Sequence, residues 1–362
     1  MTQIQKKFYP DKYVATFSVE ETNHNCRLDA FLMLFYPSHS RQHLKRKIDD
    51  GSVKISGRNA KHKPSTKLKQ GDIVTITIIK TSHEDEYWRG EKLELEMDVP
   101  ILFEDDELLA ISKPPYMSTH PTGRHLFYCA TVLMEAKYGH IIHSIHRLDR
   151  ETSGVMLMAK TASCSQKIGD EFENRTIKKC YFLIGVKRER TPDFPFTAEE
   201  RLGQKENSEY RMYIYRWPKK SNEGKHSKTE FHALWENDDY ILALAFPYTG
   251  RQHQIRAHAC EHGFPLLGDK LYDGGIPFFK RFKDGLATQE DFDLMQLSRQ
   301  ALHAIGINFP YFNEGHQRKT IISKLPKDIK EWIVENLSLK IDQLELDIEA
   351  KIKDYFKAHE DN

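Results

Sequence analysis

Short apolar runs, each about the length of a β-strand, recur from Met97 onward and constrain the fold of this chain more than any other feature. They occupy residues 99–105, 107–121, 154–161, 178–187, 240–247 and 301–309. Segments with helical spacing of apolar residues, at 130–139 and 163–174, fall between some of these runs. This pattern predicts an α+β fold, with a mixed, mostly antiparallel sheet and helices packed against it.

The chain of 362 residues is long enough for two or three domains, each with its own core. Changes in composition predict an N-terminal extension with one short strand, a small α+β domain, a polar linker, a large α+β domain and a C-terminal amphipathic helix. These segments cover residues 1–22, 23–81, 82–96, 97–325 and 326–362, in that order. Apolar residues recur at helical intervals from Ile341 to Phe356, so we expect the last helix to fold back on the protein or onto a partner.

Net charge excludes few partners, because 54 Lys and Arg stand against 53 Asp and Glu. The distribution along the chain is more informative. Between His39 and Lys80 there are eleven Lys or Arg and three Asp or Glu, an excess that favours an anionic partner such as RNA. A second charged stretch, residues 216–228, is too polar to form a core, and it predicts either a loop near the nucleic acid or a merely solvated surface.

The five cysteines are scattered, and no pair has CxxC spacing, which argues against a disulfide framework and against a thiolate metal cluster. This usage fits a reducing compartment, so we expect a cytoplasmic protein. No apolar stretch approaches the roughly 18 residues that span a bilayer, so we expect no membrane partner. The histidines and the cysteine between residues 253 and 262 match no standard zinc spacing, so we expect no metal and a hydrogen-bonded structural role for His258 and His303.

Residues 146–154, with the sequence HRLDRETSG, form a polar stretch between an apolar approach and an apolar strand. Polar loops on a buried scaffold are common positions for catalytic groups, and Asp149 is the carboxylate at the centre of this loop. Hydrolysis of a glycosidic bond needs a second carboxyl group at about 5 to 10 Å, and apart from Glu151, two residues along the loop, the sequence forces no other acid near Asp149. We therefore favour chemistry that depends on a single carboxylate.

Four stretches resemble, in the right order, the motifs of the RluA-type pseudouridine synthases. HRLDRETSG resembles the signature HRLDxxTSG of that family, in which the Asp is the catalytic residue. The other three are KKCYFLI around Tyr181, TGRQHQIRAHACEHGFPLLGDKLY at 249–272 and RQALHA at 299–304. The likeness spans most of residues 97–325. It departs from the family at Gln252 and Ala257, where Thr and Val are frequent, and these departures affect substrate fit and no catalytic group.

The resemblance implies the pseudouridine synthase fold and assigns three catalytic residues. Asp149 would attack the target uridine, Tyr181 would stack on the base or accept a proton near it, and Arg256 would pair with Asp149 and keep it ionised. The base is detached, rotated and rejoined without redox change, so the resemblance implies no cofactor and no metal. The substrate-binding residues would be Arg147, which enters the space left by the flipped uridine, Leu302 beneath the base, His146, Thr152 and Gly154.

Residues 23–81 resemble the S4-like domain, a small module whose second helix and following loop present basic side chains to RNA phosphates. Apolar residues from Leu28 to Phe35 have helical spacing, and Ser38 or Ser40 can cap a second helix. The alternative is a solvated basic face on a small α+β domain. The residues that the resemblance assigns to RNA are Arg41, Lys45, Arg46, Lys54 and Arg58.

These observations predict a monomeric RNA pseudouridine synthase that flips uridines out of structured RNA, with large-subunit ribosomal RNA as the favoured substrate. A transfer-RNA pseudouridine synthase is the alternative in the same class, and a non-catalytic RNA-binding or ribosome-assembly factor is the alternative outside it. The site residues have structural alternatives too. Asp149 could be a turn residue, Tyr181 a core aromatic, Arg256 a structural ion-pair partner and Leu302 ordinary core.

Overall fold

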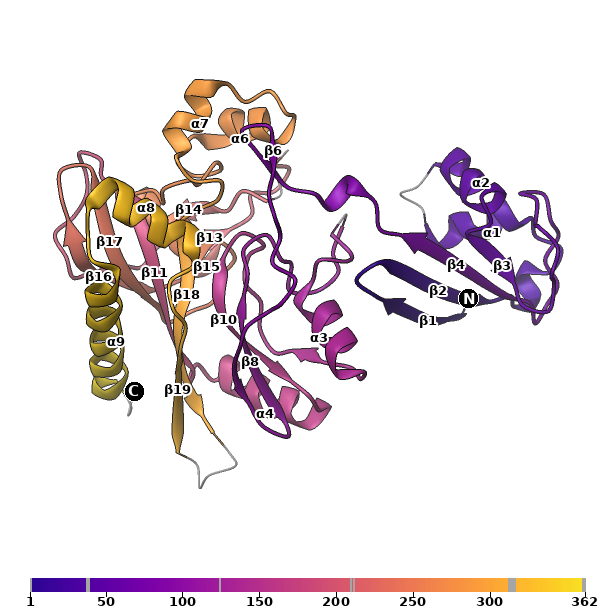
Figure 1. Ribbon diagram of the computed structural model, residues 1–362, viewed down its shortest axis with the longest axis horizontal. Helices are drawn as coiled ribbons and strands as arrows, with labels where there is room; N and C mark the ends of the chain where they lie inside the picture. The colour runs from indigo at the N-terminus through magenta and orange to yellow at the C-terminus, as the bar shows by residue number, and fades with distance from the viewer. Residues whose placement is uncertain are drawn as a thin grey trace. The chain divides into compact units, whose positions relative to one another are not determined.

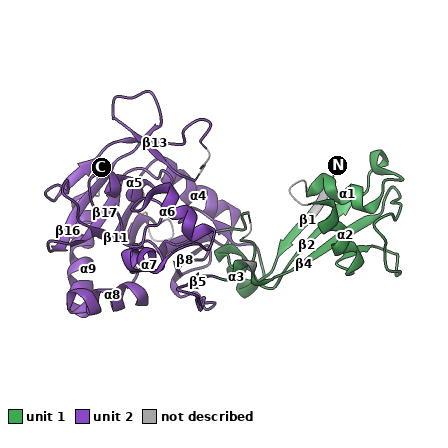
Figure 2. Cartoon of the chain, turned by 90° about the horizontal axis from the view of Figure 1, so that it is seen from above, with its two compact units in different colours: residues 1–85, 120–140 green, residues 86–119, 141–362 purple. Residues whose placement is uncertain are grey.

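The computed structural model describes residues 2–36, 40–123, 125–208, 210, 212–311 and 317–359. The chain divides into two compact units (Figure 2). Unit 1 comprises residues 1–85 and 120–140, and unit 2 comprises residues 86–119 and 141–362. The first boundary falls within the predicted linker, 82–96. The return of residues 120–140 to unit 1 was not predicted.

Unit 1 is built on a four-stranded antiparallel sheet in the order β1-β2-β4-β3. Its elements are β1 (Thr2–Phe8), β2 (Lys12–Ser18), η1 (Glu21–Asn23), α1 (Leu28–Phe35), α2 (Arg41–Asp49), β3 (Val53–Ile55), β4 (Ile73–Ile79), η2 (Ser82–Glu84) and α3 (Ala130–Tyr138). Apolar side chains of α1, α2 and the strands form one core, which includes Phe17, Phe31, Leu44 and Val74. This α+β core gives unit 1 its own hydrophobic centre.

Residues 2–8 and 12–18 form two strands of this sheet and not the separate extension with one short strand that we predicted for residues 1–22. Every second residue of β2 is buried, and β2 pairs with β4 over seven residues, from Lys12 opposite Ile79 to Ser18 opposite Ile73. β1 extends the sheet by pairing with β2. Because the partner strand β4 lies far along the chain, local alternation alone did not reveal the pairing.

The second helix of unit 1 begins and ends as its sequence predicts. Ser40 caps α2, since its Oγ accepts a hydrogen bond from the backbone N–H of His43 at 3.1 Å. Ser38, the other candidate cap, lies outside the described residues. Gly51 follows the helix with φ of +85°, a left-handed conformation that favours glycine and stops the helix after the two aspartates.

The predicted linker is ordered, and its first part is anchored in unit 1. The carboxylate of Glu84 is only 4% exposed and accepts hydrogen bonds from the backbone N–H groups of Leu126, Phe127 and Tyr128. Three consecutive N–H groups directed at one carboxylate make a strong local anchor. This contact explains why residues 120–140 belong with unit 1.

The second part of the predicted linker is anchored in unit 2, where β5 (Tyr87–Trp88) and β6 (Glu91–Lys92) form a short hairpin. The Trp88 ring stacks on Phe282 of α6 and meets Phe292 of α7 edge-on, with centroid distances of 6.2 and 4.9 Å. Next to it, Arg89 pairs with Asp293 at 2.9 Å. Residues 86–92 are therefore a packed part of unit 2 and not a free spacer.

Unit 2 contains a ten-stranded sheet whose main path is β12-β16-β17-β11-β18-β10-β8-β7, with β19 paired to β18 and β9 to β10 (Figure 1). The strands are β7 (Ile101–Glu104), β8 (Leu108–Lys113), β9 (His143–Ser144), β10 (Ser153–Ala159), β11 (Lys178–Val186), β12 (Phe196–Ala198), β16 (Thr229–Glu236), β17 (Tyr240–Pro247), β18 (Leu302–Pro310) and β19 (Arg318–Ile322). Among the strands that the structure describes in this sheet, β10 and β18 alone run parallel, over a two-residue match. The predicted class, α+β with a mixed, mostly antiparallel sheet, is confirmed.

A smaller sheet joins β13 (Arg201–Gly203), β14 (Tyr215–Trp217) and β15 (Lys225–His226). The charged stretch 216–228 contributes Arg216 and Trp217 to β14 and Lys225 and His226 to β15. These two strands each pair with β13, so the stretch is partly strand and not only a loop. The helices of unit 2 are α4 (Ala162–Glu173), α5 (Gln254–Glu261), α6 (Gly275–Lys283), α7 (Gln289–Met295), α8 (Lys327–Leu337) and α9 (Ile341–Ala358). No helix in the described part of the chain has both the length and the apolar character that crossing a membrane requires.

The C-terminal segment forms two helices, α8 and α9, where we expected one. Leu344, Ile348, Ile352 and Phe356 of α9 are buried in one core with side chains of β11 and β17. Figure 1 shows α9 running alongside the sheet. The amphipathic face therefore folds back on unit 2 itself.

Candidate active site

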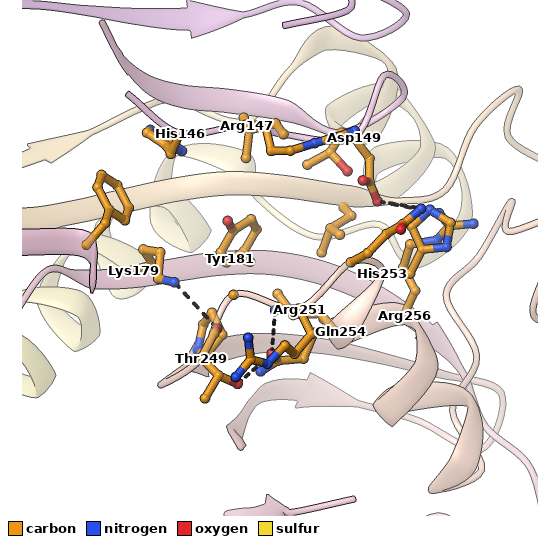
Figure 3. Close-up of a pocket in the computed structure, with 18 of the residues that line it drawn as sticks. His146, Arg147, Asp149, Lys179, Tyr181, Thr249, Arg251, His253, Gln254 and Arg256 are labelled. Carbon is orange, nitrogen blue, oxygen red and sulfur yellow. Dashed lines mark hydrogen bonds and ion pairs between the residues drawn. The ribbon is translucent and has the colours of Figure 1, made fainter. Parts of the chain in front are cut away.

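A cavity of about 330 Å³ opens in unit 2. Its walls come from the loop between β9 and β10, from β11, from the start of β18 and from the segment that joins β17 to α5. The structure brings together all but one of the residues predicted for catalysis and substrate binding (Figure 3): Asp149, Tyr181, Arg256, Arg147, Leu302, His146 and Thr152. Gly154 does not line the cavity.

The loop that carries Asp149 is closed by local hydrogen bonds. The backbone N–H of Thr152 donates to the carbonyl of Asp149 at 3.0 Å. At the other end of the loop, Nε2 of His146 accepts the backbone N–H of Leu157 in β10 at 2.9 Å. Burial, and then Lys179, lowers the pKa of His146 to about 3, so the ring is neutral and can serve as this acceptor. His146 thus holds the loop as well as lining the cavity.

Lys113 also stabilises this loop, through hydrogen bonds from its ammonium group. It stands at the end of β8 with no exposed surface, and its Nζ donates to the carbonyls of Pro114 and Met117 at 2.9 Å and of Arg150 at 3.2 Å. Burial is the largest influence and lowers the pKa of Lys113 well below its ordinary value. One side chain therefore satisfies three backbone carbonyls that would otherwise be buried without a donor.

Gly154 is required by strand pairing. Its φ is +111°, and a Cβ atom at this position would lie 2.2 Å from the carbonyl oxygen of Ala304. The close approach occurs at the short parallel match between β10 and β18, where Gly154 lies opposite Ala304. Gly154 therefore has a packing role directly beside the loop that carries Asp149, and its predicted role in substrate binding stays a prediction.

Arg256 pairs with two carboxylates, and Asp269 is the closer one. Nε and Nη2 donate to the two oxygens of the fully buried Asp269 at 2.6 and 2.8 Å, while Nη1 lies 3.5 Å from Oδ2 of Asp149. The bidentate pair fixes the guanidinium so that its remaining nitrogen faces Asp149. The expected contact with Asp149 is present, and so is the structural ion pair that we kept as an alternative. Asp269 lies within a motif we had recognised, but only the fold identified it as this partner.

The other neighbour of Asp149 is a neutral histidine. Nε2 of His253 lies 3.7 Å from Oδ2 of Asp149, and its Nδ1 lies 3.1 Å from the hydroxyl of Tyr272. Burial, followed by the cation of Arg256, lowers the pKa of His253 to about 4. Burial would also lower the pKa of Arg256, but Asp269 and Asp149 outweigh it and raise that pKa. Asp149 therefore faces one permanent cation and one neutral imidazole.

Tyr181 and Leu302 form the apolar floor of the cavity. Burial raises the pKa of the Tyr181 hydroxyl, and Asp149 raises it further, so the phenol keeps its proton at neutral pH. Of the two expected roles, stacking is therefore favoured over accepting a proton. Leu302 is 5% exposed, belongs to the same apolar cluster and lines the cavity, so it is a core residue, and its role beneath the base stays a prediction. Thr152 adds a buried hydroxyl with no hydrogen-bond partner among the described residues.

Sequence analysis missed several residues that line the cavity: Lys179, Thr249, Arg251, His253 and Gln254. All of them fall inside motifs that we had recognised, but none had been given a role at the site. Strand alternation could have found Lys179, because it lies two residues before Tyr181. The loop residues could not be placed without the fold.

The five basic residues predicted to bind RNA all lie in unit 1. Arg41 pairs with the fully buried Asp29 at 3.0 Å, and Arg58 pairs with Asp72. These two side chains therefore also have structural partners. Arg46 and Lys54 are exposed and Lys45 is partly exposed, and none of the three forms an ion pair with another described residue.

Residues 107–261 match the family model described as RNA pseudouridylate synthase. An uncharacterized RNA pseudouridine synthase of Aquifex aeolicus is 30% identical over 259 residues, which cover 68% of this chain and 76% of that protein. The ribosomal large subunit pseudouridine synthase D of Vibrio vulnificus is 28% identical over 325 residues, which cover 87% of this chain and 92% of that protein. The chain belongs to the RluA-type RNA pseudouridine synthases.

The predicted enzyme class and its RNA partner are therefore confirmed. A human protein, RNA Pseudouridylate Synthase Domain Containing 4, shares the fold of this synthase with a TM-score of 0.50 at 22% identity, over 65% of this chain and 91% of that chain. The mitochondrial tRNA pseudouridine(32) synthase of Saccharomyces cerevisiae is 30% identical over 281 residues, which cover 77% of this chain and 57% of that protein. The named relatives thus include enzymes for ribosomal RNA and for transfer RNA.

Replacing Lys113 by Met is expected to destabilise unit 2 of the synthase by about 2 kcal/mol, because three buried carbonyls lose their donor while most of the apolar stem remains. The tie to Arg150 is also lost, so we expect roughly tenfold slower catalysis from a less well-placed loop. Urea titration and single-turnover rates measure the two effects. Lys187→Met, which removes a surface ion pair with Glu236, should change stability by less than about 1 kcal/mol. Equal stability of the two variants would contradict the anchoring role.

Four histidines of unit 2 stay neutral in the folded synthase, because burial lowers the pKa of each below the ordinary value of 6.5. The pKa values fall to about 3 for His146 and His303 and to about 4 for His253 and His258. As expected, His258 and His303 are hydrogen-bonded, to Ser227 and Thr229 and to Ser153 respectively. Protonation below pH 6.5 therefore favours the unfolded chain.

The free energy of unfolding should consequently fall as the pH drops from about 6.5 toward about 4, by up to about 1.4 kcal/mol per pH unit for each of these histidines. Urea titrations followed by tryptophan fluorescence measure this in unit 2, which holds all four tryptophans of the chain. A free energy of unfolding that stayed constant between about pH 7 and about pH 5 would show that the histidines are not held neutral.

Proposed function

We propose that the synthase converts specific uridines of large-subunit ribosomal RNA to pseudouridine, with Asp149 as the catalytic carboxylate. The observation that supports this most directly is the charge of the cavity. Asp149 is the single carboxylate among the described lining residues, whereas Arg147, Lys179, Arg251 and Arg256 are cations. The single carboxylate fits chemistry that needs only one acid, and the excess of cations around it fits a substrate with negative phosphates, such as RNA.

The reaction exchanges one bond for another at the same sugar carbon. The C1′–N1 bond breaks, the base rotates in place, C5 bonds to C1′ and loses its proton, and N1 takes one up. Asp149 serves this exchange by attacking the sugar, by attacking the base or by removing a sugar proton. Arg256, held by Asp269, orients the carboxylate. Tyr181 offers a flat face to the extruded uracil, and Leu302 supports it from below.

The exposed Arg147 precedes Asp149 by two residues and lines the same cavity. We infer that it enters the space that the flipped uridine leaves in the RNA, where a guanidinium can stack and donate hydrogen bonds at the same time. Thr152, with its unpartnered hydroxyl, offers a hydrogen bond to the bound nucleotide. These two residues would bind substrate and take no part in bond breaking.

We also propose that unit 1 is an S4-like RNA-binding domain. Its α2 is rich in basic residues, and the exposed Arg46 and Lys54 are available for phosphate contacts that orient the RNA without reading its sequence. Arg41 and Arg58 would contribute through guanidinium nitrogens that their carboxylate partners do not use. Binding through these residues should weaken as the salt concentration rises.

The proposal of ribosomal RNA rests on the Vibrio vulnificus relative, which matches this chain over nearly the full length of both proteins. Transfer RNA is the second candidate because of the yeast relative. We further propose that the synthase acts as a monomer in the cytoplasm, and the five free cysteines are in keeping with a reducing compartment. Gel filtration of the purified protein tests the monomer.

The substrate is tested by incubating the purified synthase separately with ribosomal RNA and with transfer RNA from cells that lack this protein. Pseudouridines are then mapped as carbodiimide-dependent stops of reverse transcription. New stops in large-subunit ribosomal RNA alone would support the proposal. Stops confined to transfer RNA would overturn the proposed substrate while leaving the enzyme class intact.

A further inference from the structure

Lys179 lines the cavity from β11, two residues before Tyr181 and on the same face of the strand. In Figure 3, Asp149 and Arg256 lie at one end of the cavity and Lys179 lies toward the other, with Tyr181 between them. A uracil stacked on Tyr181, with its sugar at Asp149, would therefore direct the edge farthest from the sugar toward Lys179. That edge carries the carbonyl oxygen O4.

The ammonium of Lys179 has little compensation within the protein. Its Nζ donates to the carbonyl of Thr249 at 3.5 Å, which is longer than the usual range of about 2.7 to 3.2 Å for such a bond. Burial lowers the pKa of Lys179 to about 8, and no carboxylate of the residues that the structure describes opposes this shift. The fully buried Lys113, by contrast, donates to three carbonyls at 3.2 Å or less. The Lys179 ammonium is partly buried and has no carboxylate partner among the described residues, so it is suited to donate a hydrogen bond to an acceptor atom of the bound substrate.

We propose, on the basis of the proposed function, that Lys179 donates a hydrogen bond to the carbonyl oxygen O4 of the target uracil and stabilises the negative charge of the departing base. Lys179 would thus be a catalytic residue that acts on the base, whereas Asp149 acts at the reacting bond. An ammonium only donates, so it also disfavours cytosine, which has an amino group in place of O4.

The charge arises and disappears within the reaction itself. When the C1′–N1 bond breaks, its electron pair stays with the base and the charge spreads from N1 over O2 and O4. The half-turn of the base exchanges the positions of O2 and O4, so one fixed ammonium contacts a carbonyl oxygen both before and after rotation. The charge is lost when C5 bonds to C1′ and releases its proton and N1 takes one up. Addition of Asp149 to the base would likewise place charge on a carbonyl oxygen.

The test compares Lys179→Met and Lys179→Arg with Lys178→Met, a matched variant of the neighbouring residue, whose side chain points to the other face of β11. The substrate is a short RNA stem–loop that the wild-type synthase modifies, with either uridine or 5-fluorouridine at the target position. Fluorine withdraws electrons and stabilises the uracil anion, so 5-fluorouracil needs less help as it departs. Because C5 of 5-fluorouracil carries fluorine and has no proton to release, the reaction of that substrate stops after C5 bonds to C1′. The single-turnover rate followed for both substrates is therefore the loss of the starting nucleotide, and RNA affinities are measured for each protein.

We expect Lys179→Met to slow the reaction of uridine about 100-fold, with RNA affinity changed by less than about twofold. Lys179→Arg should react with uridine at least about tenfold faster than Lys179→Met. The loss for 5-fluorouridine should be about tenfold smaller than the loss for uridine, and Lys178→Met should stay within about threefold of wild type. A dependence on the leaving base is not expected from a merely structural lysine.

Equal losses for uridine and 5-fluorouridine would overturn the proposal, and so would an unchanged rate in Lys179→Met. Weaker RNA binding with an unchanged chemical rate would instead assign Lys179 to a backbone phosphate. If Lys179→Met does not fold, Lys179→Arg is used as the test variant in its place. A folded Lys179→Arg protein that reacts no faster than unfolded protein would count against the proposed role. A wild-type protein that modifies no RNA would refute the proposed function separately, before any Lys179 variant is compared.

Discussion

Asp149→Asn is expected to abolish pseudouridine formation, lowering the single-turnover rate by roughly four orders of magnitude. The amide has nearly the same shape as the carboxylate, but it can neither attack carbon nor accept a proton at neutral pH. The fold should tolerate the change, because the nearest partner of Arg256 is Asp269, at 2.6 and 2.8 Å, and Asp149 lies farther away at 3.5 Å. RNA affinity should therefore stay close to that of wild type.

The matched control for this variant is Glu151→Gln. Glu151 lies two residues along the same loop and pairs with Arg150 at 3.3 Å, but it does not line the cavity. We expect its rate to remain within about threefold of wild type, because removal of a partly exposed ion pair costs little. Comparable losses in the two variants would mean that the loop, and not the carboxylate of Asp149, limits the reaction.

Gly154→Ala is the second change with a large expected effect. The new Cβ would stand 2.2 Å from the carbonyl oxygen and 2.7 Å from the carbonyl carbon of Ala304, which are backbone atoms that cannot turn aside. The backbone is also held at a φ of +111°, which residues with a side chain rarely adopt. We expect unit 2 to lose about 3 kcal/mol or more of its free energy of unfolding.

Catalysis should fall as well, by about 100-fold, because β10 and β18 must separate at the point where the catalytic loop enters the sheet. Gly169→Ala is the matched control, since Gly169 lies within helix α4 and a Cβ there would meet no atom within 4 Å. This second variant should be unchanged or more stable by up to about 1 kcal/mol. Urea titrations and single-turnover rates follow both variants, and a Gly154→Ala protein as stable as Gly169→Ala would refute the close approach.

Sequence patterns predicted the fold class of unit 2 and the loop that carries Asp149, because both depend on local features of the chain. Apolar runs of strand length mark the sheet, and the HRLD loop places Asp149 and Arg147 close together along the chain. The resemblance to the synthase family assigned Tyr181, Arg256 and Leu302 to the same site as Asp149. The structure then gathered them around one cavity.

The parts that sequence analysis missed depend on partners far apart in the chain. The sequence analysis paired Arg256 with Asp149, and only the fold shows that Asp269 is the nearer carboxylate. The alternation in β2 did not disclose its pairing with β4, and the polar composition of residues 82–96 concealed the contact of Trp88 with α6 and α7. Charge alone likewise did not reveal that Arg41 is tied to the buried Asp29.

The most direct test of the central role of Asp149 is a pseudouridine map of cellular RNA. Cells that lack this protein are supplied with wild-type synthase, with Asp149→Asn or with Glu151→Gln, each at the same expression level. We predict that specific pseudouridines of large-subunit ribosomal RNA are missing from the deficient cells, return with wild type and Glu151→Gln, and stay missing with Asp149→Asn. Restoration of these sites by Asp149→Asn would contradict the account.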